Sequence, residues 1–175
     1  MNSTHIAVWV GAAVLLFWTV GAYNRLVRLR HTIRQQFTPV DEQFQRRQAL
    51  LLQQLTALAP LRGEDSPLLV ALRAACQQAE VAHARARTHP GATRATTSMR
   101  LAEDILADTR ARVLAEAPAD DTLTELNTRL AASDATLAFA RRQFNDAVEE
   151  YNLAVRQFPT WLIASLFSFR TAGTL

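Results

Sequence analysis

The chain has 175 residues, 49% of them hydrophobic, and its 19 basic residues, all arginine, exceed the 16 acidic ones by three. This length suits one soluble domain together with an anchor. No basic stripe interleaved with aromatic residues occurs, so we expect no nucleic acid partner. The single cysteine, Cys76, excludes an intramolecular disulfide and fits a small buried residue. With only 5 glycines and 6 prolines, the body is expected to be all-α.

A stretch without charge, residues 6–23, lies near the N-terminus and predicts a transmembrane anchor over residues 1–24. At about 1.5 Å per residue it covers ~27 Å, close to the ~30 Å of a bilayer's hydrocarbon core. Four membrane-proximal basic residues follow it: Arg25, Arg28, Arg30 and Arg34. The positive-inside rule then predicts a single-pass protein with its N-terminus outside and its remaining residues in the cytoplasm. A cleaved signal peptide is the alternative, but the positive n-region of such peptides is missing.

The first long helix is expected to continue directly from the membrane span. Apolar residues recur every three or four positions from Leu26 to Leu58 and keep their register across Pro39. This periodicity favours one helix that bends near Phe37 over a helix that restarts at the proline. Pro60, Gly63 and Pro67 are expected to mark the first turn.

Three further helices are predicted downstream. One begins at Pro67, carries a narrow alanine-rich face and ends near His89, and another runs from about Thr97 to just before Pro118. The last, from Thr122 to Phe158, contains neither Gly nor Pro and has nearly heptad spacing with one coiled-coil-like stutter. Two long outer helices and two shorter inner ones predict an antiparallel up-and-down bundle of about four helices over residues 25–159.

An apolar C-terminal tail, residues 160–175, follows the bundle and contains Trp161, Phe167 and Phe169. It is too short to span a bilayer. It therefore either packs on the end of the bundle or lies in the membrane interface, and we favour packing.

The juxtamembrane region and the last helix together resemble the LemA family. Shared positions are a Tyr-Asn pair, an Asp followed by Arg-Arg, and a closing Ala-Arg…Asn-x-x-Val-x-x-Tyr-Asn element that ends in Phe-Pro. They are Tyr23, Asn24, Asp41, Arg46, Arg47, Ala140, Arg141, Asn145, Val148, Tyr151, Asn152, Phe158 and Pro159. The resemblance implies a bacterial single-pass protein of the cell (inner) membrane with a cytoplasmic helical bundle. It supplies no catalytic residue.

No cofactor, metal site or enzymatic activity is expected. Glu80 and His83 form one Glu-x-x-His pair, but a di-iron site needs a second pair and two more glutamates on facing helices. The pair is therefore expected to form a polar edge of its helix. The sequence has no Gly-rich phosphate loop and no recognisable nucleophile motif. Glu103 and Asp104 are expected on a solvated helix face.

Polar residues that lie within or beside the apolar registers of the two longest helices are the candidate functional residues. They are Asp41, Arg46, Arg47, Asp134, Arg141, Asn145 and Asn152. Arg47 fills an apolar position and needs an acceptor, because a buried unpaired charge costs several kcal/mol. Asp134, Asn145 or Asn152 could provide it. The set is either a network that fixes the register of the bundle or a patch that docks a partner.

Two functions therefore remain open. The first is a non-enzymatic adaptor or scaffold that presents its bundle to another protein at the membrane. The second is a lipid-binding or self-assembling structural protein, in which the juxtamembrane arginines and the apolar tail contact anionic lipid and the chain forms a homo-oligomer.

Overall fold

The computed structural model describes the backbone of residues 3–63 and 65–175 and the side chains from Val8 onward, Glu64 excepted. Over these residues the protein is all-helical, which confirms the predicted fold class. Five helices follow one another: α1 (Ser3–Arg62), α2 (Pro67–Thr88), α3 (Thr93–Ala115), α4 (Asp121–Arg156) and α5 (Thr160–Leu166).

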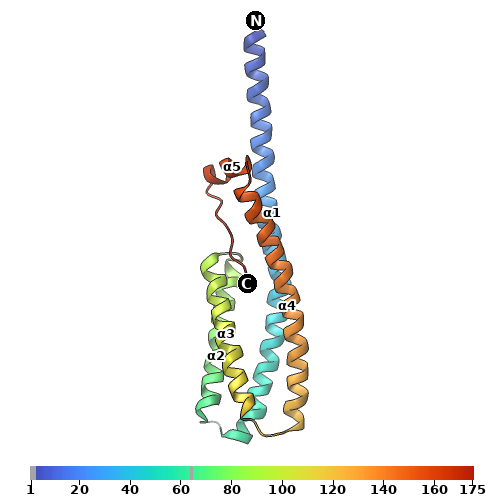
Figure 1. Cartoon of the computed structure of the whole chain (residues 1–175), viewed down its shortest axis with the longest axis vertical. Helices are drawn as coiled ribbons and strands as arrows, with labels where there is room; N and C mark the ends of the chain where they lie inside the picture. Colours follow the sequence, from blue (N-terminus) through green and yellow to red (C-terminus); the bar gives the residue numbers. More distant parts are fainter. Residues whose placement is uncertain (1–2, 64) are drawn as a thin grey trace.

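Helix α1 runs without a break from the apolar N-terminal stretch into the bundle, as the periodicity predicted (Figure 1). It passes through Pro39 even though proline cannot donate the usual backbone hydrogen bond, because its apolar face is buried both before and after that point. It also passes Pro60, which was expected to mark the turn, and ends at Arg62. The reversal is made by Gly63, whose φ of +83° suits glycine.

The N-terminal part of α1 projects beyond the other helices (Figure 1). It includes a segment long and apolar enough to cross a membrane, and little of that segment is buried by the rest of the protein. Side chains such as Trp9 and Phe17 are 75% and 78% exposed. This region therefore has the length and composition of a membrane anchor.

Helix α4 packs antiparallel along α1, and α2 and α3 form a second antiparallel pair beside them (Figure 1). Ser66 precedes α2 and Pro67 occupies its first turn, whereas the Asp120 side chain caps α4 by accepting a 2.9 Å hydrogen bond from the Leu123 amide. The shared core contains Phe44, Leu130 and other side chains that are almost wholly buried.

The two helix pairs differ in length, and this difference leaves room for the C-terminal residues beside α1 and α4. The 36 residues of α4 span about 54 Å, whereas the 22 residues of α2 span about 33 Å. The α2–α3 hairpin therefore leaves uncovered the part of the α1–α4 pair that is nearer the N-terminal apolar segment. There the chain turns back after α5 and residues 168–175, called here the tail segment, run down toward the α2–α3 turn (Figure 1).

Helix α5 packs on α1 and α4 at the end of the bundle that is nearer the N-terminal apolar segment. Ile163 and Ala164 are buried there, and the Phe167 ring lies 5.0 Å from the Tyr23 ring, between centroids. The apolar C-terminal residues thus pack on the bundle, although Leu166 remains 73% exposed on the opposite face.

Candidate functional site

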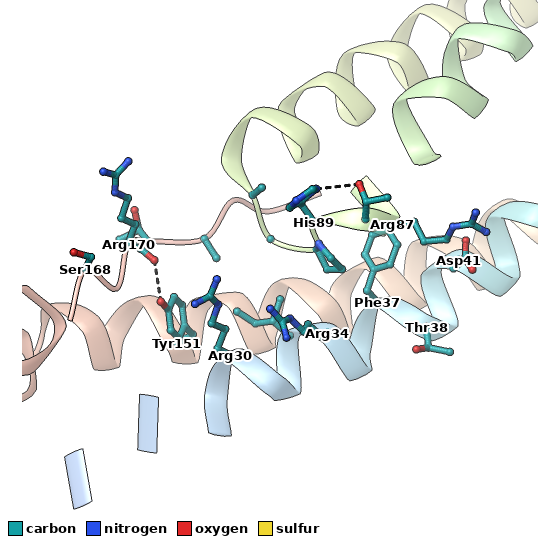
Figure 2. A pocket seen from close by; sticks show the side chains of 17 residues that line it. Arg30, Arg34, Phe37, Thr38, Asp41, Arg87, His89, Tyr151, Ser168 and Arg170 are labelled. Atoms are coloured by element: carbon teal, nitrogen blue, oxygen red, sulfur yellow. Dashed lines mark hydrogen bonds between the residues drawn. The ribbon is translucent and has the colours of Figure 1, made fainter. Parts of the chain in front are cut away.

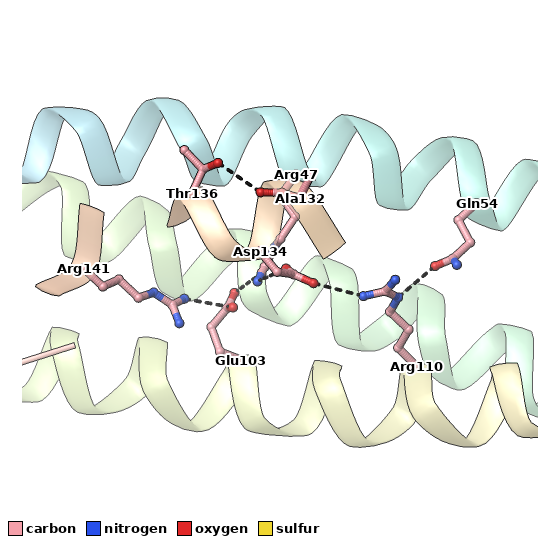
Figure 3. A network of polar contacts seen from close by, with 8 residues as sticks. All are labelled: Arg47, Gln54, Glu103, Arg110, Ala132, Asp134, Thr136 and Arg141. Carbon is pink, nitrogen blue, oxygen red and sulfur yellow. Dashed lines mark hydrogen bonds and ion pairs between the residues drawn. The ribbon is translucent and has the colours of Figure 1, made fainter. Parts of the chain in front are cut away.

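A buried network of ion pairs joins α1, α3 and α4 at the middle of the bundle (Figure 3). Glu103 accepts from Arg47 Nη2 at 2.5 Å and from Arg141 Nη2 at 2.9 Å. Asp134 lies 3.5 Å from Arg47 Nη1 and 3.2 Å from Arg110 Nη1. Arg47 and Glu103 are only 8% and 7% exposed. Arg47 thereby has the acceptor that its apolar position requires.

The network fills a wide gap between helices. Over the described residues, no Cα atom of α3 comes within 8 Å of a Cα atom of α4, so long side chains must bridge them. Arg110 continues the bridge by donating its Nε–H to Gln54 Oε1 at 3.2 Å, and Gln54 donates to Asn127 Oδ1 at 2.6 Å. These directional contacts suit the register role that the sequence raised as one alternative.

The expectation that Glu103 lies on a solvated face is wrong. Glu103 lies four residues after Met99 and three before Leu106, both buried, and so shares their apolar face. Its neighbour Asp104 is exposed, as expected. Glu103 and Asp104 are adjacent in sequence, but the helix turns by about 100° between them, so one side chain faces the core and the other faces solvent.

His83 is also buried, contrary to the expected polar edge, whereas Glu80 is exposed. Its ring stacks on Phe44 at 3.8 Å between centroids and lies 5.7 Å from Phe37. Nε2 lies 2.6 Å from Asp41 Oδ1, and no partner for Nδ1 exists in the described part of the chain. Burial lowers the pKa of His83 below 6.5, against the opposing effect of the Asp41 hydrogen bond. The ring is therefore neutral and donates its Nε2–H to Asp41.

Asn145 and Asn152 each hold the backbone of one residue of the tail segment. The Asn152 side chain donates to the Ala172 carbonyl at 2.9 Å and accepts from the Ala172 amide at 2.8 Å. Asn145 does the same with Leu175, at 2.8 Å for both bonds. The two asparagines are seven residues, or about two turns, apart and so lie on one face of α4. They bind the tail segment through hydrogen bonds to its backbone.

Two further hydrogen bonds hold the tail segment between α4 and the α2–α3 turn. The Tyr151 hydroxyl donates to the Arg170 carbonyl at 2.9 Å, and the Gly173 amide donates to the Gly91 carbonyl at 2.9 Å. A Cβ atom on Gly173 would collide with Thr96 Oγ1 and lie 2.8 Å from Thr93 Cα. The tail segment thus lies in a groove between α4 and the α2–α3 turn. The groove fits an extended backbone closely at Gly173.

A cavity of about 770 Å³ opens beside the tail segment, bounded by α1, the α2–α3 turn and residues 168–172 (Figure 2). Its charged lining side chains are Arg30, Arg34, Asp41, Arg87 and Arg170. Figure 2 shows Arg30 and Arg34 rising from α1 toward the tail segment. The single carboxylate is bonded to His83, and within the described ranges no carboxylate oxygen lies within 4 Å of any of the four arginines. The cavity is strongly basic.

The structure thus distributes the candidate residues over separate places. Arg47, Asp134 and Arg141 belong to the central network, Asp41 contacts His83, and Asn145 and Asn152 line the groove. Arg46 is exposed, and within the described ranges it makes no side-chain hydrogen bond or ion pair. Of the membrane-proximal arginines, Arg25 and Arg28 are exposed and do not line the basic cavity, which Arg30 and Arg34 do.

Potential metal ligands are scattered over the residues that the structure describes. Over that part of the chain, no three His, Cys, Asp or Glu side chains gather closely enough to hold a metal ion. Cys76 is buried, as expected, and burial raises the pKa of its thiol to about 11.

Comparison with known proteins identifies the family of the chain. Residues 36–175 match the family model described as "LemA family", which covers most of the chain and all of the groove-lining residues on α4. No curated protein matches the chain.

Proposed function

The chain belongs to the LemA family, and from that premise we propose that it is a non-enzymatic adaptor, anchored by one span in the cell (inner) membrane with its bundle in the cytoplasm. In this function the groove now filled by residues 168–175 holds an extended segment of another protein. One observation carries the proposal: Asn145 and Asn152 bind a peptide backbone through both its amide and its carbonyl groups.

The chemistry of these contacts supports exchange of the occupant. The bonds to Arg170, Ala172, Gly173 and Leu175 all go to backbone atoms. Backbone contacts supply affinity whatever the sequence of the bound segment, as in other modes of extended-peptide recognition. A partner segment with glycine at the position of Gly173 can make the same bonds.

Crosslinking in intact native membranes tests this function. A photoreactive residue replaces Thr38, which is exposed and lines the basic cavity, and in the control it replaces Leu101, exposed on α3. We expect one protein partner to be captured at Thr38, more of it when Gly173→Val expels the tail segment, and none when Asn145 and Asn152 are both changed to Leu.

Two results would count against the adaptor. The first is an equal yield of crosslinked partner at Thr38 and Leu101. The second is a yield at Thr38 that is unchanged when Asn145 and Asn152 are replaced by Leu. Either would place the contact outside the groove. Recovery of only the chain itself and lipid would favour the second function. The cytoplasmic orientation is checked separately by reporter fusions at Leu175, which should report the cytoplasmic side.

A second function, lipid binding by a structural membrane protein, is favoured by the position of α5. Its outer face exposes Trp161, Leu162 and Leu166. The residues just before it line a surface pocket together with Trp18, and the Phe167 ring just after it lies 5.0 Å from the Tyr23 ring, between centroids. This apolar face thus continues directly from the end of the span, where an interfacial helix would contact lipid.

Spin labels on the full-length chain in proteoliposomes test the lipid contact. Cys76→Ala provides the background, and Leu166→Cys is compared with Leu52→Cys, which is exposed at the far part of α1. We expect the label at Leu166 to collide with oxygen more often than with a water-soluble nickel reagent, and the label at Leu52 to show the reverse. The same behaviour at both positions would refute the lipid contact.

A further inference from the structure

The tail segment places a positive charge where positive charges already dominate. Arg30 and Arg34 of α1 and Arg87 of α2 line the basic cavity, and the tail segment adds Arg170 as a fourth cation. The one carboxylate in the lining, Asp41, is already engaged by His83 at 2.6 Å. The exposed Arg170 side chain extends away from Arg30 and Arg34 (Figure 2), so the tail segment adds positive charge to this region and offers these arginines no carboxylate.

The groove and the cavity are one continuous surface. Tyr151 lines the cavity and also binds the Arg170 carbonyl, and Ala172 lines the cavity while its backbone is held by Asn152. A segment bound in the groove therefore places its residues at positions 168, 170 and 171 at the basic cavity, whereas position 169 faces Tyr23. The backbone clamps fix where those side chains lie.

We propose that the partner segment is acidic: an extended peptide that displaces the tail segment and places Asp or Glu at the positions now held by Ser168 and Arg170, which line the basic cavity. This inference rests on the proposed adaptor function and adds the chemistry of its partner. The arginines supply charge-assisted hydrogen bonds to the carboxylates. The tail segment is then a weak internal competitor, held by its high effective concentration although its charge is unfavourable.

Peptide binding to the full-length chain in detergent micelles tests the inference. Gly173→Val opens the groove, because the added side chain collides with α3. Two fluorescent peptides are compared: residues 168–175 as they stand, and the same peptide with Arg170→Glu. We expect both to bind, and the acidic peptide to bind about five- to tenfold more tightly, an effect that weakens at high salt.

A charge change in the protein provides the matched control. Arg34→Glu should reduce or reverse the preference for the acidic peptide, whereas Arg129→Glu, which alters net charge equally at the other end of α4, should leave it unchanged. Asn152→Leu should abolish binding of both peptides, because it removes a clamp common to both.

The outcomes separate this inference from the function on which it rests. If neither peptide binds, the groove is not a docking site and the adaptor function fails as well. If both bind equally and both need Asn152, the adaptor function stands and the acidic partner is overturned. If inorganic phosphate displaces the acidic peptide far better than chloride at equal ionic strength, the cavity belongs to a free anion and the inference is again overturned.

A second measurement needs no opened groove. In the otherwise unchanged full-length chain, Arg170→Glu should slow hydrogen exchange at the amides of Ala172, Gly173 and Leu175 by about the same five- to tenfold factor. Faster or unchanged exchange would contradict the charge argument even if Gly173→Val fails to fold.

Discussion

The central network contains three arginines, Arg47, Arg110 and Arg141, but only two carboxylates, Glu103 and Asp134. This imbalance predicts an order of stability among its variants. Arg47→Met leaves two complete pairs, because Glu103 keeps Arg141 at 2.9 Å and Asp134 keeps Arg110 at 3.2 Å. We therefore expect Arg47→Met to reduce the free energy of unfolding by only about 1.5–3 kcal/mol, the value of a lost charge-assisted hydrogen bond.

Glu103→Gln removes the carboxylate that faces two arginines. Arg47, 8% exposed, then retains only Asp134 at 3.5 Å, which it shares with Arg110. Leaving a buried charge without its partner typically costs about 3–5 kcal/mol. The expected loss is thus larger than for Arg47→Met by about 2 kcal/mol. Because the residues contact each other, the double variant should lose less than the sum of the two.

Urea unfolding of the full-length chain in detergent, followed by helical circular dichroism, measures these differences. Arg129→Met, which changes an exposed arginine of α4, is the control and should leave the free energy of unfolding almost unchanged. A loss for Arg47→Met equal to or greater than that for Glu103→Gln would refute the argument from charge imbalance. Strict additivity of the two substitutions would refute the direct coupling of Arg47 and Glu103.

Three further predictions concern single buried positions. Burial holds the pKa of His83 below 6.5, so as the pH falls the unfolded chain takes up the proton before the folded chain does. The contribution of His83 to the free energy of unfolding should be fully present above about pH 6.5 and decrease below it. His83→Gln should flatten this dependence in melting curves at about pH 5–7.5. Cys76, with a thiol pKa of about 11, should resist a maleimide at pH 7.5 in the folded chain and react once urea unfolds it. Gly91→Ala should lower the free energy of unfolding by about 1–2 kcal/mol, because the φ of Gly91 is +82° and the new Cβ would lie 3.1 Å from Ile33 Cγ2. Urea unfolding measures this loss, and Gly11→Ala, where no atom beyond its own stretch of helix lies within 4 Å of the new Cβ, is the control.

The helices and their pairing could be predicted from the sequence because their signals are local. Apolar residues keep the helical period across Pro39, and the lengths of the first and last helices match. Arg47 could be singled out for the same reason, as a charge in an apolar register. Glu103 and His83 carried a similar signal: each lies three or four residues from buried neighbours on its helix, so their burial could have been inferred.

The groove could not be predicted in the same way. The tail segment has no regular secondary structure, and no periodic pattern in residues 168–175 indicates where they bind. Their place depends on the difference in length between α4 and the α2–α3 hairpin and on the fit of Gly173 against α3. Both are tertiary properties. Asn145 and Asn152 were recognised as polar residues beside the core, but their ligand, a peptide backbone, became visible only in the folded chain.

The unbroken course of α1 makes the whole molecule a lever. From Tyr23 to Arg62 the helix extends about 58 Å beyond the apolar stretch. In a protein anchored as proposed, a 10° change in the tilt of the span swings the far turn sideways by about 10 Å. A span that is too long for its membrane leans over, so this stretch of ~27 Å would tilt in a bilayer whose hydrocarbon core is thinner than that. In such thin membranes, the distance of the far end from neighbouring proteins would follow the thickness of the bilayer.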